Sequence, residues 1–140
     1  MEQIKIAIIG LGYVGLPLAR LFATKYSVVG FDVNEKRISE LKSGVDKTLE
    51  VDEKTLQDVL VERNSIGNGL LCSSSISDLK DCNYFVITVP TPVDKNNRPV
   101  LTPLIKASET VGSVLKEGDI VVYESTVYPG ATEEDCVPIL

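Results

Sequence analysis

Five short apolar runs, separated by longer segments, are the feature that most constrains how this sequence folds. They lie at 4–9, 27–32, 70–74, 84–89 and 119–124. The runs are apolar nearly throughout, as expected for strands that are buried on both faces of a parallel sheet. Because helical patterns alternate with these strands, the sequence predicts an α/β fold whose mainly parallel sheet carries helices on both faces.

The predicted helices start and stop at recognisable signals. Four of them cover 13–24, about 34 to Gly44, about 76–81, and Thr102 to about Lys116. Another helix, between the second and the third strand, is capped by Asp52 and carries Leu56, Val59 and Leu60. Pro17 is tolerated in a first turn, and Thr102 followed by Pro103 is typical of an N-cap. A last helix opens at Thr132, its predicted cap, and stops at Leu140, and no closing strands follow the fifth run. We therefore interpret 1–140 as one domain that is a fragment of a longer protein.

Three glycines stand between the first strand and the first helix, in the stretch "IIGLGYVGLPLA". In a dinucleotide-binding turn, Gly10 allows the tight turn, Gly12 lets the backbone approach a pyrophosphate, and Gly15 allows the helix to pack closely on the strand. The pyrophosphate would lie at the free N–H groups of the helix. Glycines alone are weak evidence, but the strand before them and the helix and strand after them predict a Rossmann-type, doubly wound sheet.

A carboxylate and a guanidinium follow the second strand. Asp32 lies 22 positions after Gly10, close to the spacing of the acidic residue that accepts hydrogen bonds from the adenosine ribose. Its charge would repel a 2′-phosphate and therefore favours NAD over NADP; an N-cap of the next helix is the alternative. For Arg37, one helical turn further on, the spacing leaves a cofactor contact and a solvated helix face equally open.

Composition excludes several classes of function. The net charge of −6 and the pI near 4.7 argue against nucleic-acid or anionic-membrane partners, which require a basic surface. No apolar run approaches the roughly 20 residues of a membrane-spanning helix, and the first residues do not resemble a signal peptide. The sequence therefore predicts a cytoplasmic protein.

Three cysteines and the absence of histidine limit the chemistry further. Without histidine and without a CxxC spacing, no metal site is expected, and a Ser-His or Cys-His nucleophile is excluded within this chain. Cys72, Cys82 and Cys136 are expected to be free, mostly buried thiols.

Four motifs carry a resemblance that covers the whole chain. "GLGYVGLPLA", "GFDVNEKRISELKSG", "VPTPVD" and "YESTVYPGATEE" occur in that order. They resemble the N-terminal NAD-binding domain of the UDP-glucose/GDP-mannose dehydrogenase family, the nucleotide-sugar 6-dehydrogenases. "TVYPG" in particular resembles the branch that acts on UDP-N-acetylhexosamines in bacterial capsule or O-antigen pathways. The resemblance implies oxidation of the C6 alcohol of a UDP-sugar to a carboxylate with two NAD⁺, through a thioester on a cysteine.

The resemblance also implies roles for individual residues. In the glycine turn, Gly10, Gly12 and Gly15 hold the pyrophosphate, and Tyr13 and Val14 line the turn. At the adenosine end, Asp32 binds the ribose and Arg37 assists. Thr91 contacts the cofactor, and Ser125 and Thr126 lie near the nicotinamide, where Thr126 is a candidate for assistance to catalysis. The position of Thr91, Ser125 and Thr126 after strands agrees with these roles, because ligands bind at the carboxyl ends of parallel strands. Taken singly, Thr91 and Thr126 could equally cap backbone groups of their loops.

The catalytic cysteine of the family belongs to a glycine-rich motif in a downstream sugar-binding domain that this sequence lacks. We therefore expect residues 1–140 to bind NAD without turning over a sugar, and the full-length protein, with its central helical segment, to bind the UDP-sugar and to be a homo-oligomer. Two alternatives remain: a free-standing NAD-binding regulatory module, and a domain of a hydroxyacid-type dehydrogenase. Neither would require "VPTPVD" or "STVYPG".

Overall fold

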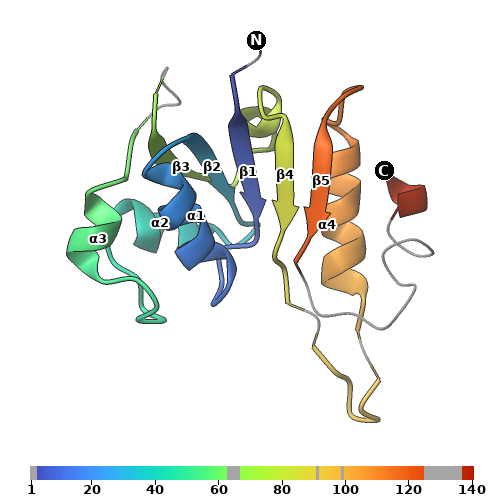
Figure 1. Cartoon of the computed structure of the whole chain (residues 1–140). Helices are drawn as coiled ribbons and strands as arrows, with labels where there is room; N and C mark the ends of the chain where they lie inside the picture. Colours follow the sequence, from blue (N-terminus) through green and yellow to red (C-terminus); the bar gives the residue numbers. More distant parts are fainter. Residues whose placement is uncertain (1–2, 63–66, 91, 99, 125–136) are drawn as a thin grey trace.

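The computed structural model describes residues 3–62, 67–90, 92–98, 100–124 and 137–140. Its strands are β1 (Lys5–Ile9), β2 (Ser27–Phe31), β3 (Gly69–Ser73), β4 (Tyr84–Ile87) and β5 (Ile120–Tyr123). All four pairings between neighbouring strands are parallel, and the strands form one sheet in the order β3-β2-β1-β4-β5 (Figure 1). The predicted parallel α/β sheet is confirmed.

The direction of winding changes between β1 and β4. The chain passes from β1 outward through β2 to β3 and then returns to the other side of β1, where Ile9 pairs with Ile87. The carboxyl ends of β1 and β4 therefore lie side by side while the segments that follow them lead apart. In open α/β sheets this switch point is where ligands bind.

Helices cover both faces of the sheet. They are α1 (Gly15–Ala23), α2 (Glu35–Lys42), α3 (Glu53–Gln57) and α4 (Thr102–Gly112), with 3₁₀ helices η1 (Ile76–Leu79) and η3 (Val137–Ile139). Ile6 and Ile8 of β1 pack with α1, α2 and α3, whereas Ala7 and Ile9 pack with η1 and α4 on the other face. This alternation is the period of two that a strand imposes. The helices flank the sheet in Figure 1, and the doubly wound prediction is confirmed.

Several predicted helix boundaries were wrong. Val14 is the N-cap of α1, so that helix begins at Gly15. The helix that Asp52 caps ends at Gln57, because the chain beyond it becomes extended and Leu60 forms a bridge with Leu70 of β3. The segment predicted as helix over 76–81 is a 3₁₀ turn that ends at Leu79.

The helix α4 also departs from its prediction at both ends. Leu101 is the N-cap of α4, and Thr102 is its first residue, with Pro103 following inside the first turn. The helix ends at Gly112 rather than near Lys116. The helix expected to open at Thr132 lies outside the described residues.

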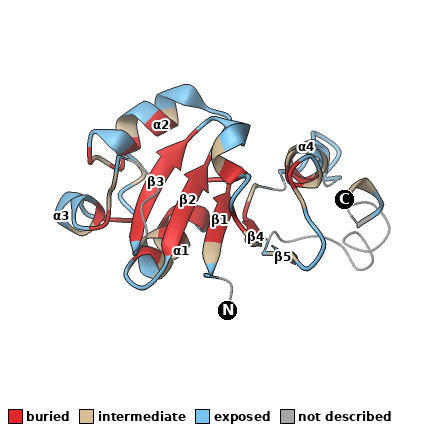
Figure 2. Cartoon of the chain, turned by 90° about the horizontal axis from the view of Figure 1, so that it is seen from above, coloured by how far each residue is buried: buried red, intermediate tan, exposed pale blue. Residues whose placement is uncertain are grey.

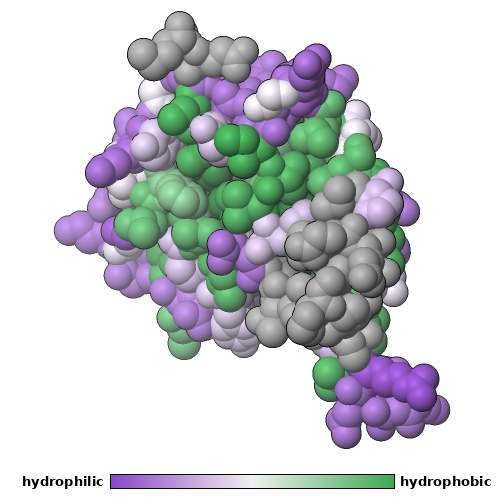
Figure 3. Space-filling model, turned by 45° about the vertical axis from the view of Figure 1, so that its right-hand side comes forward, coloured by the Kyte–Doolittle hydropathy of each residue, from purple (hydrophilic) through white to green (hydrophobic). Residues whose placement is uncertain are grey.

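The two edges of the sheet differ in their surroundings. Along the outer edge of β3, Leu70 exchanges hydrogen bonds with segment 59–61: its N–H donates to Val59 O (2.7 Å) and its carbonyl accepts from Val61 N–H (2.9 Å). At the other edge, Ile120 and Val122 of β5 are 45% and 37% exposed. Figure 2 shows the central strands as buried and β5 as not, and Figure 3 shows apolar surface on the side of the molecule that carries β5. None of the described helices is long and apolar enough to cross a membrane.

Candidate functional site

The glycine turn lies at the switch point and is held from both sides. The N–H of Gly10 donates to Phe31 O at the end of β2 (2.8 Å). Gly10 has φ of +102°, and a Cβ there would lie 3.0 Å from the backbone N of Val89, which follows β4. A Cβ on Gly15 would overlap the carbonyl oxygen of Gly10 and approach Thr88 Oγ1 to 2.5 Å. Both glycines are therefore required by the packing of the turn itself.

Gly12 has a different environment. A Cβ at this position would meet no atom within 4 Å, so the folded chain does not require glycine there. The N–H groups of Tyr13 and Val14, just before α1, donate to no acceptor in the part of the chain that the structure describes. Free N–H groups at the positive end of a helix dipole favour an anion. The open side of Gly12 is therefore a space that a phosphate group fits.

Thr88 fastens the turn to the sheet, and sequence reasoning missed it. Its hydroxyl Oγ1 donates to Gly10 O (2.7 Å), with Ile9 O as a second, longer acceptor (3.1 Å). The residue is buried, although it stands one position beyond β4. A polar residue within the apolar run "YFVITV" was the only signal of this role, and a hydroxyl there satisfies the buried carbonyls of the turn.

Asp32 connects the glycine turn to the start of α2. Its Oδ2 accepts from the N–H of Leu11 (2.9 Å) and its Oδ1 from the N–H of Asn34 (2.9 Å). Asn34, not Asp32, is the N-cap: its Oδ1 accepts from the N–H groups of Lys36 and Arg37. The N-cap alternative for Asp32 was therefore wrong, because α2 begins three residues later. A carboxylate has about four acceptor positions, so Asp32 keeps capacity for ribose hydroxyls.

Arg37 is a buried part of the same framework, and the solvated helix face was wrong. Its side chain is 10% exposed. Nε donates to the carbonyl of Leu11 (2.8 Å), and Nη1 donates to Glu40 Oε2 (2.7 Å) and to Asp46 Oδ1 (2.8 Å). Nη2 is buried without a partner in the described part of the chain. A buried donor without an acceptor costs free energy, and a ligand acceptor in this region would remove that cost.

Asp46 holds Arg37 in place through the ion pair with Nη1. The residue is 3% exposed, and its carboxylate accepts from the N–H groups of Thr48, Glu50 and Val51 and from the Thr48 hydroxyl. Burial raises the pKa of Asp46, but the hydrogen bonds from Thr48, Arg37 and Val51 outweigh it and lower the pKa to about 2. Asp46 is therefore ionised and holds the guanidinium with a full negative charge.

A cleft of about 530 Å³ brings these elements together. Its walls come from the glycine turn, the ends of β1 and β2, Val89 and Pro90 after β4, and the first turns of α4. Asp32 and Arg37 line it, and most of the remaining lining is apolar. An apolar cleft with a few convergent polar groups is typical of a cofactor site, and the open Gly12, the carboxylate of Asp32 and the unpartnered Nη2 of Arg37 all fit a dinucleotide.

Two of the predicted site residues, Tyr13 and Val14, are not brought into this cleft. Tyr13 and Val14 are 69% and 56% exposed on the glycine turn, and neither lines the cleft. Thr91, Ser125 and Thr126 lie outside the described residues.

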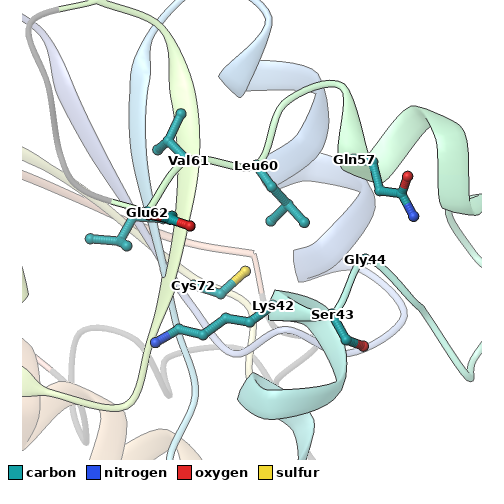
Figure 4. A pocket seen from close by; sticks show the side chains of 9 residues that line it. Lys42, Ser43, Gly44, Gln57, Leu60, Val61, Glu62 and Cys72 are labelled. Atoms are coloured by element: carbon teal, nitrogen blue, oxygen red, sulfur yellow. The ribbon is translucent and has the colours of Figure 1, made fainter.

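A second hollow, of about 420 Å³, lies between α2, α3 and β3 (Figure 4). Cys72 lines it, and burial raises the pKa of this thiol to about 12, so the thiolate nucleophile is not formed near neutral pH. Cys82 is likewise buried, with a pKa of about 12. Free, buried thiols are confirmed for these two residues, whereas Cys136 lies outside the described residues. Within the described ranges, no three acidic or cysteine side chains gather as metal ligands.

Comparison with known proteins decides the family. Residues 4–140 match the NAD binding domain of the UDP-glucose/GDP-mannose dehydrogenase family. The chain belongs to this family. Its cofactor is NAD, and the resemblance seen in the sequence motifs is confirmed.

Relatives in the family have similar sequences and folds. The chain is 60% identical over 140 residues to a UDP-N-acetyl-D-glucosamine 6-dehydrogenase of Salmonella typhi and 56% identical over the same length to one of Pseudomonas aeruginosa. It covers 31% of each of these proteins. Among solved structures, the UDP-D-ManNAc dehydrogenase of Pyrococcus horikoshii superposes with a TM-score of 0.84 at 38% identity, over 94% of this chain and 30% of that one. The chain therefore spans about a third of the length of the relatives that it matches.

Proposed function

We propose that residues 1–140 are the NAD-binding domain of a nucleotide-sugar dehydrogenase that oxidises the C6 alcohol of a UDP-N-acetylhexosamine to a uronic acid with two NAD⁺. The names of the relatives from Salmonella typhi and Pseudomonas aeruginosa support this substrate class. NAD supplies the acceptor for the hydride. The sugar-binding domain and the catalytic cysteine belong to the further part of the protein, by analogy with relatives about three times as long.

Each residue of the glycine turn has a place in this proposal. Gly10 and Gly15 shape the turn, and Gly12 leaves room for the pyrophosphate, which would accept from the N–H groups of Tyr13 and Val14. Asp32 would accept from the ribose hydroxyls and Arg37 would donate to the adenosine end through Nη2. Thr91, Ser125 and Thr126 complete the proposed cofactor contacts, with Thr126 on the nicotinamide side.

The open side of Gly12 is the observation that carries the proposal. At Gly10 and Gly15 a side chain would collide with neighbouring atoms, so packing explains these glycines. At Gly12 a side chain would meet no atom of the described part of the chain, so packing does not explain this glycine. A ligand that approaches the backbone is the remaining physical reason for a residue without Cβ.

Two matched substitutions test it. We expect Gly12→Ala to keep the urea midpoint of the original chain but to weaken NAD binding in titration calorimetry by about tenfold or more, because its methyl group occupies the approach of the pyrophosphate. Gly15→Ala should instead lose stability, since its methyl group overlaps the turn. A Gly12→Ala chain that binds NAD as tightly as the original would refute the cradle.

The activity is tested on the same chain. With NAD and UDP-N-acetylglucosamine, the purified chain should bind NAD without forming NADH. Steady oxidation of the sugar by residues 1–140 would contradict our proposal that the sugar-binding domain and the catalytic cysteine lie outside them.

We also propose that the whole protein is a cytoplasmic homo-oligomer without nucleic-acid or membrane partners. The net charge of −6 supports the absence of polyanionic partners. Size-exclusion chromatography with light scattering on the full-length protein tests the oligomer, and a monomer would contradict it.

A further inference from the structure

The guanidinium of Arg37 makes most of its hydrogen bonds within the fold, through Nε and Nη1. In dinucleotide sites an arginine near the end of the second strand accommodates a 2′-phosphate, while an acidic residue there selects the free 2′-hydroxyl. This chain carries both types, Asp32 and Arg37, at the same end of the cleft. The sequence favours NAD through Asp32, but it does not show what keeps Arg37 from binding a 2′-phosphate.

The acidic partners of Arg37 neutralise the positive charge that could otherwise attract a 2′-phosphate. Glu40 and Asp46 both accept from Nη1, and the side chains of Arg37, Glu40 and Asp46 are 10%, 14% and 0% exposed. Glu40 and Asp46 pair with the one guanidinium, and Asp32 lines the same end of the cleft but accepts from backbone N–H groups rather than from the guanidinium. Three carboxylates against one guanidinium leave two net negative charges near the ribose end. Coulomb repulsion is strong where water is largely excluded, so this end disfavours a phosphate dianion.

Geometry limits Arg37 in the same way. Nε is bound to the carbonyl of Leu11 in the glycine turn (2.8 Å), and Glu40 Oε2 is itself fixed by the N–H of Lys47 (2.8 Å). The guanidinium therefore cannot turn both edges toward a ligand, as a bidentate contact with phosphate requires. Only Nη2 remains without a partner in the described part of the chain. One donor without net positive charge suits a neutral hydroxyl oxygen.

We propose that Glu40 and Asp46 are specificity-determining positioning residues, which act through Arg37 to make the ribose end of the cleft accept a 2′-hydroxyl and reject a 2′-phosphate. The inference rests on the proposed cofactor contacts of Asp32 and Arg37. Lys106 also lines the cleft, but it is exposed and comes from α4, on the other face of the sheet from α2.

Glu40→Gln tests the proposal, with NAD and NADP as the titrants in calorimetry. Glutamine keeps an acceptor for Nη1 and for the N–H of Lys47 but removes one negative charge. We expect the ratio of the NADP to the NAD dissociation constant to fall by about fivefold or more, the order expected when one like charge leaves a partly buried site. Glu40→Asp, which keeps the charge, should leave the ratio high. Glu117→Gln, an equal charge change at an exposed position outside the cleft, should also leave it unchanged.

A purely structural role would weaken both dinucleotides equally, so a ratio within twofold of the original chain in Glu40→Gln overturns the proposal. The same fall of the ratio in Glu117→Gln also overturns it, because net charge alone would then explain the effect. If the original chain binds NAD but the ratio does not move, only this inference fails; if the original chain binds no NAD, the proposed function fails with it.

A measurement on the unmodified chain covers the case in which Glu40→Gln does not fold. Repulsion of the 2′-phosphate is screened by salt, so the ratio should fall between about 0.02 and 0.5 M NaCl. A ratio that is independent of salt overturns the proposal.

Discussion

Removal of the Thr88 hydroxyl should loosen the glycine turn. Thr88→Val keeps the size of the side chain but leaves the buried carbonyl of Gly10 without the 2.7 Å hydrogen bond that it accepts from Oγ1. The carbonyl of Ile9 still accepts from the backbone N–H of residue 88. The substitution therefore leaves one buried acceptor, the carbonyl of Gly10, without its hydroxyl donor. Leaving such a group unsatisfied costs about 1–3 kcal/mol. This is a measurable part of the roughly 5–15 kcal/mol that stabilises a domain, so the variant should still fold.

Urea unfolding and NAD titration measure the two consequences. We expect Thr88→Val to lower the free energy of unfolding by about 1–3 kcal/mol and to weaken NAD binding, because the turn that would hold the pyrophosphate loses its attachment to β4. Thr88→Ser is the matched control: it loses a methyl group, worth roughly 1 kcal/mol, but keeps the hydroxyl and the NAD affinity. A valine variant within about 0.5 kcal/mol of the original chain, or a serine variant that loses NAD affinity as strongly, would refute the reasoning.

Two further predictions concern ionisable groups. The pKa of Asp46 is about 2 in the folded chain, below its usual 3.8, so its ionised form stabilises the fold by about 2 kcal/mol above pH 4. This contribution should disappear as the pH falls from about 4 to 2; urea unfolding should show it as a stability difference from Asp46→Asn that shrinks in that window, and a constant difference would contradict it. Burial keeps the pKa of Cys72 and of Cys82 at about 12, so both thiols should resist a thiol reagent at pH 8 in the native chain and react in urea. Rapid labelling of either without urea would show that the native core exposes it.

The elements of the fold could be predicted because their signals are local. Runs of β-branched residues, the glycines after the first strand and the cap at Asp52 each act within a few residues, and each appears in the structure. Boundaries were harder, since they depend on distant contacts. Leu60 continues the apolar pattern of a helix, but pairing with Leu70 places it in an extended bridge.

Some residues that line the cleft could be predicted from the sequence, but the hydrogen bonds that support them could not. Gly12 and Asp32 belong to a motif with known spacing, and both line the cleft. Thr88 is bonded to a carbonyl 78 positions earlier in the chain. Arg37 is bonded to a turn 26 positions earlier and to Asp46 nine positions later. Spacing along one sequence does not reveal such pairs, because they exist only after the sheet has brought the segments together.

The unequal edges of the sheet have a consequence for how such a domain can be reused. β1, which leads into the glycine turn, has a hydrogen-bonded strand on each side, and the outer edge of β3 is partly occupied by segment 59–61. Within the strands, the exposed large apolar side chains are Ile120 and Val122 of β5, two strands from β1. New strands or partners can therefore be added at β5 without altering the neighbours of β1.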